Sequence, residues 1–167
     1  MNKTLVLYFS VYGTAKKTAE EIARQTGADL KEIVPEEPYD SNREHYNALA
    51  RRAKVEHDRN MRPSIKNPID ISGYDTIFIG YPMWWYTFPM ILYTLFDQLD
   101  FSGKTIIPFN THMGSGDGGT YETIKTLEPK ADVREGLPIE MSEAETGNPE
   151  KIQAWLKKVM GADHNWE

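Results

Sequence analysis

The sequence predicts an α/β protein, a three-layer sandwich in which a five-stranded parallel sheet has helices on both faces. Apolar runs at Thr4–Phe9 and Thr76–Gly80 are nearly continuous, which is typical of strands that are covered on both faces. Segments with helical periodicity alternate with the strands, and this alternation builds a parallel sheet through right-handed crossovers. The 167 residues suit one domain, which we expect over residues 1–160, followed by a polar tail over residues 161–167.

The first half of the chain is expected to supply two strands and two helices. After the first strand, a helix over Thr14–Thr26 gathers small and apolar residues on one face and ends at Gly27. Residues Ala28–Val34 alternate polar and apolar side chains, as in an edge or half-covered strand. A second helix is expected between Asp40 and Asn60, followed by an extended connection that contains prolines. Its expected inner face comprises Tyr46, Leu49, Ala50, Ala53 and His57.

The second half continues the alternation after the strand at Thr76–Gly80. The remaining elements, in order, are a helix that begins at Pro89, a strand at Thr105–Phe109, a helix at Thr120–Leu127, a short irregular strand within Ala131–Ile139 and a helix that begins at Asn148-Pro149. The expected buried faces of the first and last of these helices are Ile91, Leu92, Leu95, Phe96 and Leu99, and Ile152, Trp155, Leu156, Val159 and Met160.

Composition excludes several kinds of chemistry. The chain has no cysteine, which excludes disulfides, thiolate catalysis and cysteine-ligated metal clusters, and its four histidines lack metal-binding spacing. No apolar run is long enough to span a membrane, and the first residues resemble a strand rather than a signal peptide. A net charge of −6 disfavours nucleic acid and suits a basic partner. We therefore expect a cytoplasmic protein that holds no metal and binds neither membrane nor nucleic acid.

Three loops should meet at the carboxyl ends of the strands, where sheets of this kind bind ligands. The first loop, after the first strand, contains Ser10, Tyr12, Gly13, Thr14 and Ala15. Its hydroxyl groups and the free N–H groups at the start of the following helix can surround a phosphate. The alternative is that Ser10 or Thr14 simply caps the helix.

The loop after the Thr76–Gly80 strand is rich in aromatic residues. Between Tyr81 and Pro89 it contains Pro82, Met83, Trp84, Trp85 and Tyr86. Indole and phenol faces stack well on a planar, electron-poor ring system such as isoalloxazine, and prolines keep such a loop stiff. The alternative is that these aromatic side chains cover the core or form an oligomer interface.

The third loop, expected over Asn110–Gly119, is rich in glycine. Such a backbone can approach a ligand closely, and its N–H groups can bond the polar edge of a flavin ring. The candidate ligand-binding residues here are Thr111, His112, Gly114, Ser115, Gly116 and Gly118. The alternative is a flexible surface loop, with His112 solvated.

Taken together, the loops resemble the flavodoxin family, and most closely its small bacterial members with a tandem-tryptophan loop. The motifs that carry the resemblance are Tyr8-Phe9-Ser10 with Gly13-Thr14, Gly80-Tyr81-Pro82-Met83-Trp84-Trp85, Phe101-Ser102-Gly103-Lys104-Thr105, and Gly114-Ser115-Gly116. The resemblance implies strand order 2-1-3-4-5, flavin mononucleotide (FMN) as cofactor and electron transfer as the task. It implies that the first loop binds the phosphate and that the other two contact the ring.

The chain also departs from the family pattern. Tyr12 and Ala15 stand where relatives usually carry smaller hydroxyl residues, and Tyr86 stands where many relatives carry glycine. Three functions therefore stay open: an electron carrier, an NAD(P)H-dependent flavin or quinone oxidoreductase that uses FMN, and a flavin-free interaction module. The expected partner is a redox protein or a small redox substrate, and the protein is expected to be a monomer or a homodimer.

Overall fold

The computed structural model describes residues 3–161 and contains a parallel sheet. The strands, in the order in which they lie side by side, are β2 (Asp29–Glu32), β1 (Thr4–Tyr8), β3 (Thr76–Pro82), β4 (Thr105–His112) and β5 (Asp132–Val133), with β6 (Leu137–Glu140) also paired to β4. The expected order 2-1-3-4-5 is confirmed. Of the polar tail expected over residues 161–167, all but Gly161 lies outside the described residues.

The fifth strand position is filled by two short strands instead of one. β5 pairs with Thr105 and Ile106 at the start of β4, and β6 pairs with the last four residues of β4. Between the two stretches lies Pro108, which has no N–H to donate to a neighbouring strand. The buried Gly136, just before β6, has room for no side chain, because a Cβ there would lie 2.5 Å from the Tyr121 ring.

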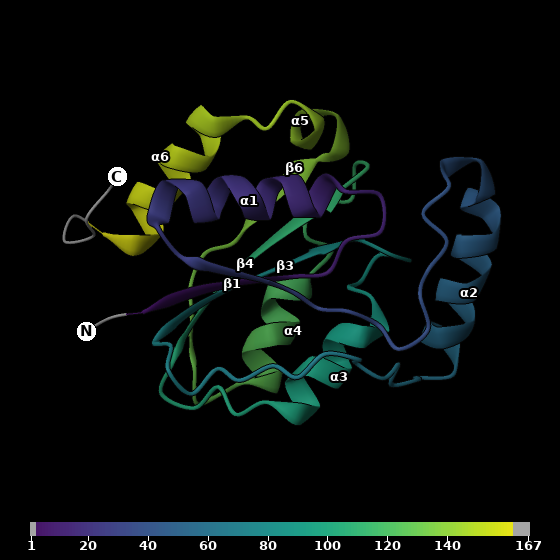
Figure 1. Cartoon of the computed structure of the whole chain (residues 1–167), viewed down its shortest axis with the longest axis horizontal. Helices are drawn as coiled ribbons and strands as arrows, with labels where there is room; N and C mark the ends of the chain where they lie inside the picture. Colours follow the sequence, from purple (N-terminus) through teal and green to yellow (C-terminus); the bar gives the residue numbers. More distant parts are fainter. Residues whose placement is uncertain (1–2, 162–167) are drawn as a thin grey trace.

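Helices cover both faces of the sheet (Figure 1). On one face lie α1 (Thr14–Thr26), α5 (Met141–Glu145) and α6 (Pro149–Met160), and on the other α3 (Met90–Gln98) and α4 (Thr120–Leu127). The short helix α5 was not expected from the sequence. α1 ends at Gly27, whose φ of 72° suits a glycine C-cap, whereas Pro89 precedes α3 as its cap instead of being its first residue.

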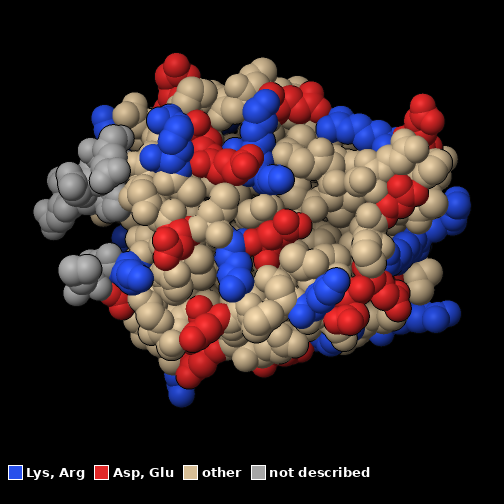
Figure 2. All heavy atoms as spheres, viewed as in Figure 1, with Lys and Arg blue, Asp and Glu red and all other residues tan. Residues whose placement is uncertain are grey.

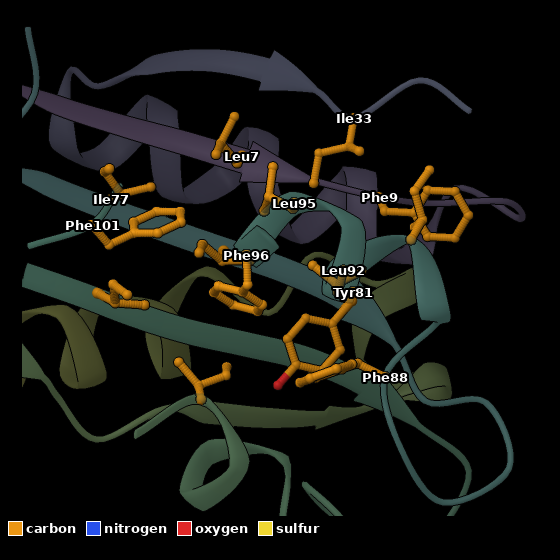
Figure 3. Close-up of a cluster of buried hydrophobic side chains, with 14 of the residues drawn as sticks. Leu7, Phe9, Ile33, Ile77, Tyr81, Phe88, Leu92, Leu95, Phe96 and Phe101 are labelled. Carbon is orange, nitrogen blue, oxygen red and sulfur yellow. The ribbon is translucent and has the colours of Figure 1, made fainter. Parts of the chain in front are cut away.

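Each face of the sheet has its own apolar core. Figure 3 shows Leu7 and Ile77 of the sheet beside Leu92, Leu95 and Phe96 of α3, all in one buried cluster. The expected buried faces of α3 and α6 are confirmed, except that their last members, Leu99 and Met160, are only partly buried. The core therefore holds the loops at the carboxyl ends of β1, β3 and β4 on a rigid frame. None of the helices within residues 3–161 is long and apolar enough to cross a membrane.

The helix expected between Asp40 and Asn60 is shorter and lies outside the helical layers. It forms as a 3₁₀ turn, η1 (Arg43–His45), followed by α2 (Tyr46–Asp58). Figure 1 places α2 at one end of the sandwich, beyond the carboxyl ends of the strands. The chain then returns to β3 through an extended connection, as expected.

The inner face predicted for α2 is partly wrong. Tyr46 and His57 are exposed, and Glu56 is buried in their place. The Glu56 carboxylate accepts a 2.6 Å hydrogen bond from the Tyr39 hydroxyl and a 3.3 Å bond from Arg52. These partners make burial of the charge possible, and apolar periodicity alone does not reveal such partners.

Candidate functional site

A cavity of about 710 Å³ opens at the carboxyl ends of the strands. Three of its walls are the loops that the sequence singles out, and the fourth is α2. The residues that line it are Ser10, Val11, Tyr12, Thr14, Tyr46, Asn47, Leu49, Ala50, Ala53, Pro82, Met83, Trp84, Trp85, Tyr86, Met113, Gly114, Ser115 and Met141. This volume lies within the range typical of small-molecule and cofactor sites.

The first loop presents unpaired backbone N–H groups. The Ser10 hydroxyl oxygen accepts a 3.1 Å hydrogen bond from the N–H of Gly13, whose φ of 92° leads into α1. Within residues 3–161, no group accepts from the N–H of Thr14, Ala15 or Lys16 in the first turn of α1. Side-chain capping of α1, the alternative interpretation, is not observed. The free N–H groups and the helix dipole make this end of α1 suitable for an anion.

The aromatic loop folds into a tight two-residue hairpin. Trp84 and Thr87 exchange backbone hydrogen bonds of 2.8 and 3.2 Å, and the central residues Trp85 and Tyr86 have φ values of 53° and 62°. Side chains other than glycine rarely adopt this conformation, which typically costs about 1 kcal/mol or more per residue. Strained residues of this kind are concentrated at functional sites, so the hairpin is a strong candidate for ligand contact.

The two tryptophans of the hairpin have different surroundings. The Trp84 ring is half-buried and packs edge-on against Phe9 and Tyr39, with ring centres 5.4 and 5.1 Å away. The Trp85 ring is 44% exposed and lies against α2, where Lys54 Nζ is 5.2 Å from the ring centre. Trp84 therefore belongs to the rigid base of the cavity, and Trp85 belongs to its edge.

The glycine-rich loop begins later than predicted. Thr111 and His112 lie in β4, which continues three residues beyond the expected strand end. Asn110, also in β4, is buried and donates a 2.9 Å hydrogen bond from Nδ2 to the Gly116 carbonyl, while its Oδ1 accepts from the Tyr121 hydroxyl. His112 Nδ1 accepts a 3.0 Å bond from the N–H of Gly114. These contacts hold the loop from inside, so it is not simply a flexible loop.

The structure brings most of the predicted site residues to the cavity. Those that do not line it are Gly13, Ala15, Thr111, His112, Gly116 and Gly118. The side chain of Ala15 is fully buried, and Thr111 Oγ1 is buried without a hydrogen-bond partner in the described part of the chain. Gly118 packs against the aromatic hairpin, since a Cβ there would lie 2.4 Å from Met83 Cε and 2.8 Å from the Tyr86 carbonyl oxygen.

Sequence reasoning missed one whole wall of the cavity. That wall comes from α2 and includes Tyr46, Leu49, Ala50 and Ala53, which the sequence places on one helical face without indicating a ligand site. Val11, Asn47, Met113 and Met141 were also missed. Helical periodicity shows which residues share a face, but it does not show what that face contacts.

The cavity has a polar end beside the first loop. The Tyr12 hydroxyl is buried and has no hydrogen-bond partner within residues 3–161. Burial and the neighbouring Tyr46 and Asp40 raise the pKa of Tyr12, while the positive charge of Arg43, 5.5 Å from the ring centre, lowers it. Tyr12 therefore keeps its proton at neutral pH and can act as a hydrogen-bond donor.

Two bacterial flavoproteins are among the solved structures that resemble this chain. A candidate flavoprotein from Bacteroides eggerthii is 34% identical, with a TM-score of 0.81, and the match covers 96% of this chain and 99% of that one. A flavoprotein from Lactobacillus acidophilus, solved in complex with FMN, is 27% identical, with a TM-score of 0.69, over 89% of this chain and 99% of the other.

Two further comparisons concern sequence. An NAD(P)H dehydrogenase (quinone) from Gluconacetobacter diazotrophicus is 34% identical over 87 residues, which are 49% of this chain and 39% of the relative. The match thus spans about two fifths of that relative's length. The family model described as flavodoxin matches residues 3–159, which is nearly the whole chain. With its sheet order and the position of its cavity, this match shows that the chain belongs to the flavodoxin family.

Proposed function

We propose that the chain binds FMN in the cavity at the carboxyl ends of its strands and transfers electrons. The observation that carries the proposal is that one cavity is lined by both the first loop, which leads into the unpaired N–H groups of α1, and a rigid aromatic hairpin. FMN carries a phosphate at one end and a planar ring system at the other. An anion site beside a planar aromatic surface matches these two parts. The FMN complex of the Lactobacillus acidophilus flavoprotein supports the same assignment.

The residues divide into two groups by the part of FMN that they would hold. The first group would bind the phosphate and consists of Ser10, Tyr12, Gly13, Thr14 and Ala15. Ala15 would contribute its backbone N–H. The second group would contact the flavin ring. It consists of Pro82, Met83, Trp84, Trp85 and Tyr86 of the aromatic hairpin, and of Thr111, His112, Gly114, Ser115, Gly116 and Gly118 of β4 and the loop after it. When bound, FMN accepts electrons from one molecule and passes them to another, and the protein supplies position and environment.

The mouth of the cavity suits contact with a redox partner protein. Trp85, Tyr86 and Met113 line the cavity and are also 44%, 78% and 79% exposed, so large apolar side chains surround its opening. Figure 2 shows acidic and basic side chains interspersed over one face of the molecule instead of one continuous acidic patch. Apolar contact at the mouth, more than net charge, therefore supports a partner at this position.

An NAD(P)H-dependent flavin or quinone oxidoreductase is the second candidate. It is favoured by the likeness to the NAD(P)H dehydrogenase (quinone), which covers about half of this chain. The substrate would then be small, and a homodimer is one way to complete its site. A flavin-free interaction module that uses the aromatic hairpin is the third candidate. We also propose a cytoplasmic location and a place among the tandem-tryptophan members of the family.

Turnover separates the two redox functions. FMN-loaded protein is mixed with NADH or NADPH, with and without a soluble quinone, and the decrease in nicotinamide absorbance is followed. A carrier leaves the nicotinamide unchanged until a separate reductase is added. Steady oxidation by the protein alone would assign it to the oxidoreductases. Failure to bind FMN at all would favour the interaction module.

A further inference from the structure

Two basic side chains from distant parts of the sequence meet at one residue, Glu145 in α5. Arg43 Nη1 lies 3.0 Å from the Glu145 carboxylate, and Lys17 Nζ donates to the Glu145 backbone carbonyl. Arg43 belongs to η1, and Lys17 belongs to the first turn of α1. The three residues therefore connect the segment that precedes α2 with the helix whose start is open to an anion.

This group of residues lies beside the first loop. The guanidinium carbon of Arg43 is 5.5 Å from the centre of the Tyr12 ring, and Tyr12 lines the cavity. The backbone N–H of Lys17 bonds the Gly13 carbonyl, so Lys17 directly follows the residues with open N–H groups. Arg43 therefore lies beside the first loop, and Glu145 accepts from Arg43 through its carboxylate and from Lys17 through its backbone carbonyl.

We propose that Arg43 is a further cofactor-binding residue, which exchanges its bond to Glu145 for a bond to the cofactor's phosphate. The inference rests on the proposed FMN function and goes beyond the loop residues already assigned to the phosphate. It adds a positively charged side chain to the hydroxyl and N–H groups that the sequence analysis expects around the phosphate.

The present partner of Arg43 is easily exchanged. The side chains of Arg43 and Glu145 are 55% and 50% exposed, and exposed ion pairs contribute little to stability because water and salt screen them. A phosphate carries more charge than a carboxylate, and the planar guanidinium can donate two parallel hydrogen bonds to it. The exchange therefore favours phosphate once FMN occupies the cavity.

The alanine at position 15 gives the proposed bond between Arg43 and the phosphate a role. Ala15 is fully buried and has no hydroxyl with which to bond the phosphate. Arg43 reaches the same loop from another segment, so it can replace the missing interaction. Because η1 leads directly into α2, binding through Arg43 would also fix the helix that forms the fourth wall of the cavity.

The test is binding of FMN and of riboflavin, which lacks the phosphate, to the flavin-free full chain. Dissociation constants are measured from the quenching of flavin fluorescence at low and at high salt. Arg43→Gln should weaken the binding of FMN by roughly tenfold, because a hydrogen bond to a charged group contributes that much. It should weaken the binding of riboflavin, which has no phosphate, by less than about twofold. The loss of FMN affinity on adding salt should also be smaller in Arg43→Gln than in the natural protein.

Three variants serve as controls. Arg51→Gln removes an exposed arginine of α2 that forms no ion pair within residues 3–161, and it should leave both constants unchanged. Arg43→Lys keeps the charge and should recover part of the affinity. Glu145→Gln removes the carboxylate that competes for Arg43, so it should tighten the binding of FMN but not that of riboflavin. Circular dichroism confirms that each variant is folded.

The outcomes separate this proposal from the proposed function. Suppose that the natural protein binds FMN, but Arg43→Gln weakens the binding of FMN and of riboflavin equally, or changes neither. Arg43 then does not bind the phosphate. If Glu145→Gln weakens FMN as much as Arg43→Gln does, Glu145 is a required support and the exchange is wrong. If the natural protein binds neither flavin, the FMN function fails, and this inference fails with it.

Discussion

The indole N–H of Trp85 donates a 2.8 Å hydrogen bond to the backbone carbonyl of Ala50. This bond joins the strained aromatic hairpin to α2, the helix that lies outside the sandwich. Both residues line the cavity, so the bond closes one corner of the site. The position of α2 and the orientation of the Trp85 ring therefore depend on each other.

Replacing Trp85 tests this corner. Trp85→Ala should weaken FMN binding by roughly 1–3 kcal/mol if the ring stacks on the flavin, as for aromatic side chains that stack on bases. Trp85→Phe keeps a ring but loses the bond to Ala50, so it should cost about 1 kcal/mol of stability. Trp155→Phe is the control, because Trp155 also donates to a backbone carbonyl but belongs to the buried face of α6, in the core. Unchanged FMN affinity in Trp85→Ala would remove the stacking role from this residue.

The backbone of Tyr86 should favour glycine. Tyr86 is 78% exposed and has a φ of 62°, so its replacement by Ala or Gly removes few contacts. Because glycine adopts positive φ without strain, Tyr86→Gly should be about 1 kcal/mol more stable to urea than Tyr86→Ala. Greater stability of the alanine variant would show that the hairpin does not hold residue 86 in this conformation.

Gly118 should be essential for the position of the hairpin. Gly118 and Gly116 have similar φ values, +56° and +63°, but a Cβ meets Met83 and Tyr86 only at Gly118. Gly118→Ala should therefore destabilise the protein by at least about 1 kcal/mol more than Gly116→Ala, which serves as the control. Chemical denaturation of both variants measures the difference. Equal costs would mean that the loop and the hairpin are not in contact.

Ser10 should contribute to phosphate affinity through the shape of the first loop. Its hydroxyl accepts the Gly13 N–H, so Ser10→Ala removes both a hydroxyl and the bond that shapes the turn. FMN should be weakened by about 1 kcal/mol more than riboflavin in a fluorescence titration. Ser102→Ala is the matched control, because Ser102 precedes β4 at the opposite end of the sheet. Equal losses for the two flavins would contradict a phosphate role.

Alkaline pH should destabilise the fold, in part through Tyr8. Burial, with the negative charges of Glu32 and Glu20, raises the pKa of Tyr8 to about 12, against about 10 in an unfolded chain. Between these values the unfolded chain loses a proton that the folded chain keeps, so stability is full below pH 10 and falls as pH rises toward 12. The Tyr8 contribution is on the order of 2 kcal/mol. Urea unfolding of Tyr8→Phe should show a smaller loss across this range, and an unchanged loss would contradict the raised pKa.

Much of the frame could be predicted because burial leaves a clear pattern in the sequence. The apolar runs at Thr4–Phe9 and Thr76–Gly80 form β1 and β3, because a short continuous apolar run between turns is typical of a strand that is covered on both faces. The loops that follow β1 and β3 could be located for the same reason, because they begin near the ends of the apolar runs, whereas the loop after β4 begins three residues later than its apolar run ends.

Other features depend on contacts that a one-dimensional pattern does not contain. β4 extends through Asn110 and Thr111 because a hydrogen bond to Gly116 and one from Tyr121 satisfy the buried Asn110 amide. The position of α2 depends on Tyr39 and Arg52, which make burial of Glu56 possible. In each case a polar residue is buried because specific partners bond it, and apolar periodicity does not show such partners.

The most direct test of the central claim is a visible absorption spectrum of the purified protein, recorded again after FMN is added and the excess is removed. We expect the absorption bands of protein-bound flavin, close to one FMN per chain, and weaker bands when riboflavin replaces FMN at the same concentration. A protein that retains no flavin in either sample would contradict the account. The cavity between α1, the aromatic hairpin and α2 would then serve a ligand other than FMN.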